Sequence, residues 1–312
     1  MLWIDGEEND FNTKIKNIPD MYKKNIFELR NLGYTIIKNV NSEQLCDEFV
    51  NSFEDFIKKD QRLDNSEKGD YFHGKRWIAG HSLNSSTKNT ACNEKVLKLL
   101  DIIFETEAVV YSSLIFWKGT QQGVHRDTPH FYTNPQDTYF GCWYALEDIH
   151  PDSGPLFYYE EGHKLNIPSG KYIYNETKEK FPQITDKEEL NFKCLVSYCD
   201  GYINNSCNKK NNYKYALINK GDCIIWHPKL PHGGSKINNK SLFRKSCVTH
   251  CIPINKRVKS STYFFSDTYK DSQDYNNLYN DKNIPYNTAP NGRKYISCGV
   301  LEGKPIVQTT YT

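Results

Sequence analysis

The sequence lacks the features that mark secreted, membrane-spanning or nucleic-acid-binding proteins. Its first eight residues form neither a basic nor an apolar segment of the kind that directs secretion, and no apolar run approaches the length that spans a bilayer. Lysine and arginine number 40 against 38 aspartate and glutamate, and no basic block suggests a phosphate-binding surface. We therefore expect a cytoplasmic protein that binds neither membranes nor nucleic acid.

The sequence also lacks paired cysteines. It has ten cysteines, but no two are separated by the two residues that are common in zinc and redox sites. The closest pair, Cys247 and Cys251, has no second pair of ligands at zinc-finger spacing. Most of the cysteines are therefore predicted to be buried thiols in a reducing compartment, without a disulfide framework or structural zinc.

The chain is long enough for one large core, with 312 residues of which 38% are hydrophobic and 14% aromatic. We predict a single domain over residues 1–312, without internal repeats. Residues 1–106 are expected to be mainly helical because apolar side chains recur there at helical spacing. The expected elements are helices over about 19–33, 42–57 and 94–105, with a strand over 34–37.

The pattern changes to short β-like runs after residue 107. The predicted strands cover 108–111, 114–117, 139–146, 223–226 and 246–249. Short strands separated by turn signals are typical of an antiparallel sandwich or jelly roll, here with helices supporting one side. We expect the β core to span 107–256. A polar insertion at about 171–215 is expected to cover one end of it, and residues 257–312 form a C-terminal extension without clear periodicity.

The residues most indicative of chemistry are two histidines and an aspartate. His125 and Asp127 would project from the same face of a strand, because alternate residues do so. His232 follows the predicted strand at 223–226 and supplies a third side chain. Two histidines and one carboxylate on one face of a metal leave the opposite positions open, which is the arrangement used for Fe(II) and dioxygen chemistry.

A candidate carboxylate anchor lies twelve residues beyond His232. Arg244 is on the next predicted strand, and its guanidinium offers a fork that matches a carboxylate through two hydrogen bonds. Alone, Arg244 would be interpreted as half of a surface salt bridge. Its position after His232 favours an anchor for the distal carboxylate of 2-oxoglutarate.

Further motifs extend this pattern in a fixed order along the chain. They are HRDT (125–128), WYALED (143–148), DSGPL (152–156), EGHK (161–164), GDCIIWH (221–227), LPHGGS (230–235) and RKS (244–246). As an ordered set they resemble the phytanoyl-CoA dioxygenase (PhyH-like) family of Fe(II)/2-oxoglutarate-dependent oxygenases over about residues 19–252. One departure is EGH at 161–163, where Gly-Ser-His is more usual.

The resemblance implies a mainly β, cupin-like double-stranded β-helix with supporting N-terminal helices. It implies Fe(II), 2-oxoglutarate and O2 as cofactors or co-substrates, and His125, Asp127 and His232 as iron ligands. His232 is preferred to His227 because small residues follow it as in the family. The resemblance also places Trp143 beside the 2-oxoglutarate, although a central-strand tryptophan can equally be core, and lets Ser246 assist Arg244.

The expected reaction is hydroxylation of an unactivated carbon of a small molecule, with release of succinate and CO2. Asp127 disfavours halogenation, because related halogenases have a small residue in its place. Desaturation, epoxidation and ring formation remain open as outcomes of the same chemistry. Two rival functions are a non-catalytic jelly-roll binding module, which would have a broken triad, and a metal-dependent hydrolase or isomerase, which would not need Arg244.

Four residues near the triad are candidates for contact with the substrate. They are Arg126, His130, Tyr132 and Tyr158. The content of 22 tyrosines and 2 methionines favours a polar or saccharide-like substrate over a long acyl chain, because phenol side chains offer both an apolar face and a hydrogen bond. The insertion at 171–215 is a candidate lid. No pattern indicates an oligomeric state.

Overall fold

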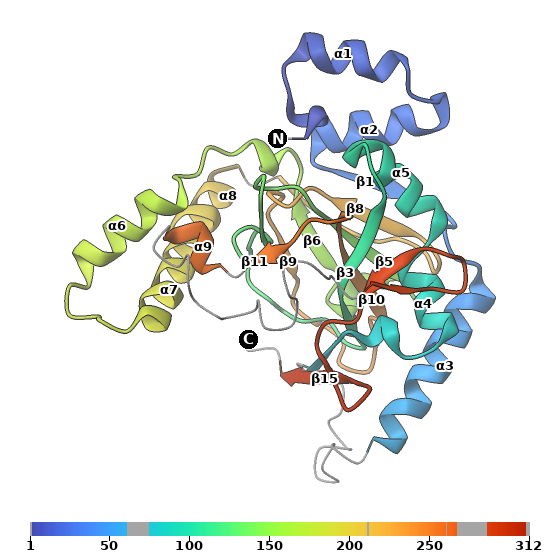
Figure 1. The fold of residues 1–312 in the computed structure, drawn as a ribbon. Helices are drawn as coiled ribbons and strands as arrows, with labels where there is room; N and C mark the ends of the chain where they lie inside the picture. The colour runs from blue at the N-terminus through green and yellow to red at the C-terminus, as the bar shows by residue number, and fades with distance from the viewer. Residues whose placement is uncertain (1, 61–74, 211, 260, 267–285, 310–312) are drawn as a thin grey trace.

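A ten-stranded sheet runs through the computed structural model, which describes residues 2–60, 75–210, 212–259, 261–266 and 286–309 (Figure 1). Its main path has the order β1 (Tyr34–Ile37), β8 (Cys223–Trp226), β5 (Phe140–Ala145), β10 (Ser246–Pro253), β3 (Ala108–Phe116), β2 (Lys75–Ile78), β15 (Lys304–Thr309), β14 (Val300–Leu301). Neighbours along this path are antiparallel. The two predicted strands at 108–111 and 114–117 are thus one strand, β3.

A smaller sheet faces the large one and completes the jelly roll. It consists of β7 (Tyr213–Tyr215), β6 (Leu156–Tyr159) and β9 (His232–Gly234), in that order and antiparallel. Residues from both sheets line one cavity, including Leu156 on β6 and Val248 on β10. The predicted double-stranded β-helix is therefore confirmed, and the cavity lies between its sheets.

Strand β5 shows why the sheet carries near-continuous apolar sequence. All six of its residues are buried, but the two faces pack differently because successive side chains alternate. Cys142 and Tyr144 join the large core, whereas Trp143 and Ala145 join a second cluster toward the smaller sheet. A strand that is covered on both faces needs no alternation of polar and apolar residues.

The N-terminal helices cover the outer face of the large sheet. They are α1 (Glu8–Lys16), α2 (Asp20–Leu32), α3 (Glu43–Lys59), α4 (Ser85–Ala91) and α5 (Glu94–Phe104). The predicted signals operate as expected: Gly33 ends α2 with a φ of 84°, and the Ser42 hydroxyl accepts the Leu45 N–H at 3.1 Å to cap α3. Phe49 and Phe53 on α3 are fully buried in the large core.

The insertion is helical rather than irregular. It contains α6 (Gly170–Lys180), α7 (Lys187–Val196), a π-helical segment (Ser197–Asn204) and α8 (Asn205–Lys210), which share a small core with α9 (Thr262–Phe265). Figure 1 shows α6 and α7 at one side of the molecule, away from α3 and α4. None of the described insertion residues lines the cavity, so the lid stays a prediction.

The C-terminal extension completes the edge of the large sheet. β15 pairs with β2, and β13 (Lys294–Ile296) pairs in parallel with β3 and antiparallel with β12 (Tyr286–Thr288). β11 (Val258–Lys259) pairs with β4 (Tyr132–Thr133). All ten cysteines are free and eight are buried, as expected for reduced thiols. Within the described ranges, no helix combines the length and apolar character needed to cross a bilayer.

A buried histidine ties the extension to the sheet. The Nδ1 atom of His81 lies 2.6 Å from the Ser113 hydroxyl of β3, and Nε2 lies 3.0 Å from the Ile296 carbonyl of β13. A neutral ring satisfies both partners by donating from Nε2 to Ile296 and accepting at Nδ1 from Ser113. Burial lowers the pKa of His81 to about 4, although the bond to Ile296 raises it.

We predict that acid destabilises the fold through His81. Between the unfolded pKa of about 6.5 and the folded pKa of about 4, the unfolded chain binds a proton that the folded chain does not. The free energy of unfolding should therefore fall as the pH falls through this window, by up to about 3 kcal/mol from this group. Urea unfolding at several pH values should show a flatter pH dependence for His81→Gln than for wild type. Parallel curves would contradict this assignment.

Candidate active site

The two histidines of the triad are brought together by the backbone. His125 and His232 form a bridge in which each N–H donates to the other residue's carbonyl at 2.9 Å. His232 opens β9, but the segment around His125 is not a full strand, and Asp127 stands at the start of a turn. The prediction that His125 and Asp127 share a strand face is therefore corrected: a single bridge followed by a turn aims both side chains at one point.

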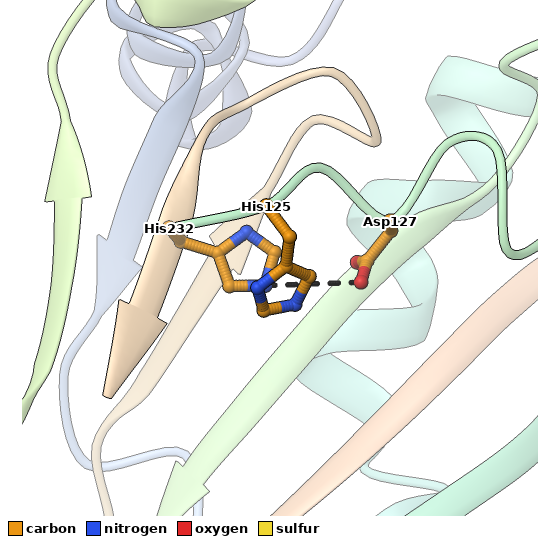
Figure 2. A group of neighbouring side chains, drawn as sticks. All are labelled: His125, Asp127 and His232. Carbon is orange, nitrogen blue, oxygen red and sulfur yellow. Dashed lines mark ion pairs between the residues drawn. The ribbon is translucent and has the colours of Figure 1, made fainter. Parts of the chain in front are cut away.

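The three side chains form a compact cluster of potential metal ligands. One ligand atom from each of His125, Asp127 and His232 lies within 4.8 Å of the others. His232 Nε2 is 3.7 Å from Asp127 Oδ1, and the two imidazole centroids are 4.5 Å apart. Figure 2 shows the three side chains pointing toward one another. This spacing suits one metal ion that contacts all three residues.

Each histidine has its other ring nitrogen held by a carbonyl. His125 Nδ1 lies 2.9 Å from the Gly123 carbonyl oxygen, and His232 Nδ1 lies 2.9 Å from that of Leu230. A carbonyl only accepts, so both rings carry a proton on Nδ1, which leaves Nε2 as the nitrogen that a metal could bind. Such bonds fix the tautomer and orientation of a metal-binding histidine.

The aspartate is held through the oxygen that faces away from His232. The indole N–H of Trp226 donates to Asp127 Oδ2 at 2.7 Å, and His250 Nε2 lies 3.6 Å from the same oxygen. Burial raises the pKa of Asp127, but His232 and His250 together lower it well below its usual range. Desolvation and His232 lower the pKa of His125 to about 3. At neutral pH the cluster is thus one carboxylate with a neutral His125, as metal binding requires.

The cluster opens into a cavity of about 630 Å³ between the sheets. Arg244 and Trp143 line the same cavity as the three candidate ligands. The Arg244 guanidinium carbon lies 5.7 Å from the ring centroids of both Trp143 and Phe116. The sequence-based placement of Arg244 and Trp143 near the triad therefore agrees with the geometry.

Arg244 is a buried cation with unused hydrogen-bonding capacity. Its Nη1 donates to the Gly154 carbonyl at 3.4 Å, while Nε has no partner among the described residues. Burial lowers the pKa of Arg244 to about 10, and Glu147 only partly counters this. The Ser246 hydroxyl is also buried without a partner there. Unpartnered donors of this kind fit an incoming carboxylate, which would accept from both.

The four candidate substrate residues separate into two groups. His130 lines the cavity, but Arg126, Tyr132 and Tyr158 do not. Arg126 donates to the carbonyls of Gly162 and Leu165 at 2.8 and 3.1 Å, so it holds a loop. Tyr158 lies on β6 with its ring 4.4 Å from that of Tyr34. These three residues were predicted from their positions along the sequence, but they do not line the cavity.

Sequence reasoning missed several residues around the cluster. Trp226 and His250 were absent from the predicted site although both contact Asp127. His227, the next residue after Trp226, points to the opposite side of the sheet. There the Nε2 atom of His227 lies 3.4 Å from Asp5 Oδ2. Alternation along the predicted strand at 223–226 was the signal that could have placed Trp226 toward the cavity.

A jelly roll with two histidines, a carboxylate and a buried arginine around one cavity is the arrangement of non-haem iron oxygenases. The family model described as phytanoyl-CoA dioxygenase (PhyH) matches residues 29–246, and the chain belongs to this family. The protein is a 2-oxoglutarate-dependent non-haem iron oxygenase.

Individual relatives are distant. The peroxisomal phytanoyl-CoA dioxygenase of Bos taurus is 22% identical over 261 residues, 78% of this chain and 71% of the relative. Among solved structures, the non-heme alpha ketoglutarate dependent carbocyclase SnoK from nogalamycin biosynthesis has a TM-score of 0.54 at 15% identity and covers 78% of this chain and 87% of that one. EctD from S. alaskensis with 2-oxoglutarate and 5-hydroxyectoine has a TM-score of 0.52 at 12% identity, covering 77% and 82%. These similarities show a common fold.

Proposed function

We propose that His125, Asp127 and His232 hold Fe(II), and that Arg244 binds the distal carboxylate of 2-oxoglutarate with help from Ser246. The observation that carries this proposal is Arg244, a buried guanidinium with an unpartnered Nε in the same cavity as the three ligands. A metal hydrolase or isomerase in this barrel would have no use for that cation. A binding module that had lost its chemistry would not need to keep all three ligands within 4.8 Å.

The protein residues have separate roles in this mechanism. Bound iron, 2-oxoglutarate and dioxygen supply the oxidation of a substrate C–H bond, with release of succinate and CO2. The Gly123 and Leu230 carbonyls keep Nε2 of each histidine available, and Trp226 and His250 keep Asp127 Oδ1 turned inward. Trp143 lies beside Arg244. There it would exclude water and so strengthen the ion pair between Arg244 and the carboxylate of bound 2-oxoglutarate.

Hydroxylation of a small polar molecule is the proposed outcome. Asp127 would supply the third protein ligand and so leave no ligand position for a halide, and the Trp226 indole N–H holds its carboxylate in place. The cavity wall includes Tyr111, Ser112 and Gln122, which offer hydrogen bonds to a polar substrate. The wall also includes apolar side chains, such as those of Leu114, Phe116 and Val248, against which an unactivated carbon could pack.

The test is product analysis with isotopically labelled dioxygen after a screen for succinate release. A substrate identified in this way is expected to gain one oxygen atom from dioxygen. A product that has lost two hydrogens, closed a ring or gained a halogen would replace hydroxylation by that outcome while leaving the oxygenase class intact. Metal-dependent turnover that ignores 2-oxoglutarate would contradict the proposed use of Arg244.

A tryptophan that touches no metal is expected to control iron affinity. Trp226→Phe keeps the buried ring but removes the indole N–H that donates to Asp127 Oδ2 at 2.7 Å. Loss of an outer partner of this type weakens metal binding about 10–100-fold. The measurement is Fe(II) affinity under anaerobic conditions. Trp77→Phe is the matched control, because Trp77 is equally buried but packs against Phe53 in the large core. Equal affinities of the two variants would contradict the role of Trp226.

A further inference from the structure

The cavity extends well beyond the candidate iron site. Its far wall is built by β2, by the segment before β11 and by the strands of the C-terminal extension. Eight of the lining residues come after β10 and lie outside the family match, which ends at residue 246. They are Lys256, Arg257, Val258, Ile296, Cys298, Gly299, Ile306 and Gln308. This part of the wall lies beyond the three candidate metal ligands and Arg244, so it can contact a substrate.

This wall is strongly cationic. Among the described residues that line the cavity, the lysines and arginines are Arg76, Arg244, Lys256 and Arg257, and the only acid is Asp127. The proposed centre is neutral when loaded, because the charges of Fe(II) and Arg244 balance those of Asp127 and dianionic 2-oxoglutarate. Arg76 and Lys256 then remain as cavity-lining cations that the cofactors do not use.

Arg76 has the geometry of a ligand-binding cation. It is on β2, where alternation points Arg76 and Ile78 into the cavity and Trp77 into the large core. Its Nη2 donates to Gln308 Oε1 of β15 at 3.3 Å, which holds the side chain in place. Its Nε is buried without a hydrogen-bond partner in the described part of the chain. Burial lowers the pKa of Arg76, as expected for a guanidinium withdrawn from water.

Arg76 lines the same cavity as His130 and the three candidate metal ligands. His130 itself lies 6.2 Å from His125 between ring centroids. A substrate group held at Arg76 would therefore leave its neighbouring carbons within the space that faces the metal ligands.

We propose that the substrate carries an oxyanion, either a carboxylate or a phosphoryl group, that is bound by Arg76 on the cavity wall that also carries Lys256. This deepens the proposed function and rests on it. A guanidinium held by Gln308 matches two oxygens of either group, and the low dielectric of the cavity strengthens that pairing. A neutral saccharide would offer Arg76 no counter-charge.

The test measures the binding of matched anionic and neutral probes. The intact chain is loaded with Zn(II) and saturating 2-oxoglutarate, so that Arg244 is occupied. Benzoate, benzamide, phenyl phosphate and phenol are then titrated by ligand-observed NMR. At least one anion is expected to bind about tenfold more tightly than its neutral partner, since hydrogen bonds to a charged group exceed neutral ones by that order. Which anion binds better identifies carboxylate or phosphoryl recognition.

Variants assign the effect to Arg76. Arg76→Gln is expected to weaken binding of the preferred anion about tenfold or more and to leave the neutral probe unchanged. Arg76→Lys keeps the charge and should restore part of the affinity. Lys98→Gln is the matched control, because it removes one exposed positive charge from α5, outside the cavity. Equal binding of anions and neutral probes, no anion binding, or no effect of Arg76→Gln would overturn the proposal.

The outcome is separable from that of the proposed function. The absorption band of Fe(II) with 2-oxoglutarate depends on the triad and Arg244, and it should persist in Arg76→Gln, which also reports that the variant is folded. A normal band without anion selectivity would refute only the substrate inference. Loss of the band in the wild-type protein would refute the proposed cofactor site on which it rests.

Discussion

Replacing His232 with alanine is expected to abolish Fe(II) binding and all 2-oxoglutarate turnover. The ligand atoms of His125 and Asp127 would remain, but the facial arrangement for Fe(II) needs three protein ligands. The loss should exceed the roughly 10–100-fold that follows from changing an outer partner of a ligand. Metal affinity by anaerobic titration and succinate release report the two effects separately.

The neighbouring histidine supplies the control for this variant. His227 lies five residues before His232 in the same segment and is fully buried, but its Nε2 faces Asp5 at 3.4 Å. His227→Gln should retain Fe(II) binding and affect mainly the free energy of unfolding. If His227→Gln lost the metal while His232→Ala kept it, the assignment of the distal ligand would be wrong.

Replacing Arg244 with methionine is expected to raise the KM for 2-oxoglutarate about 30-fold or more. The side chain is buried beside Trp143, and a carboxylate left there without its cation would be a buried, unpaired charge. Breaking such a pair from one side costs about 2–5 kcal/mol, which corresponds to a factor of this size. Fe(II) binding without 2-oxoglutarate should change little, because Arg244 is not among the three clustered ligands.

Two further variants separate charge from geometry at this position. Arg244→Lys keeps a positive charge but loses the planar fork, so its KM should fall between wild type and Arg244→Met. Arg126→Met removes another buried arginine whose contacts are the carbonyls of Gly162 and Leu165. It should lower stability without changing the KM for 2-oxoglutarate. A KM that is insensitive to Arg244→Met would remove Arg244 from the proposed binding site.

Much of the fold is predictable because its central elements have strong local signals. Helix α3 combines a serine cap with an apolar stripe, and β5 is apolar on both faces because both faces are covered. Arg244 was predicted from its spacing after His232, and both residues line the same cavity. In these segments, local preference and tertiary packing favour the same structure.

Other features depend on contacts that no local pattern reveals. Strand β15 is defined by pairing with β2, more than two hundred residues earlier in the chain, so Arg76 and Gln308 meet only in the folded protein. The helices of the insertion were not predicted, because they are polar and bury few residues, such as Ile173 and Cys194, in a small core of their own. Tyr158, in contrast, was placed at the substrate by its position in the sequence, but its ring packs on Tyr34.

The most direct test of the central proposal is the anaerobic addition of Fe(II) and 2-oxoglutarate to the apo protein. A weak visible absorption band should appear only when both are present. It should be absent in His232→Ala and require far more 2-oxoglutarate in Arg244→Met. That result would establish one site in which the triad binds iron and Arg244 anchors the co-substrate. An intact, folded protein that gives no band with both additions would contradict this account.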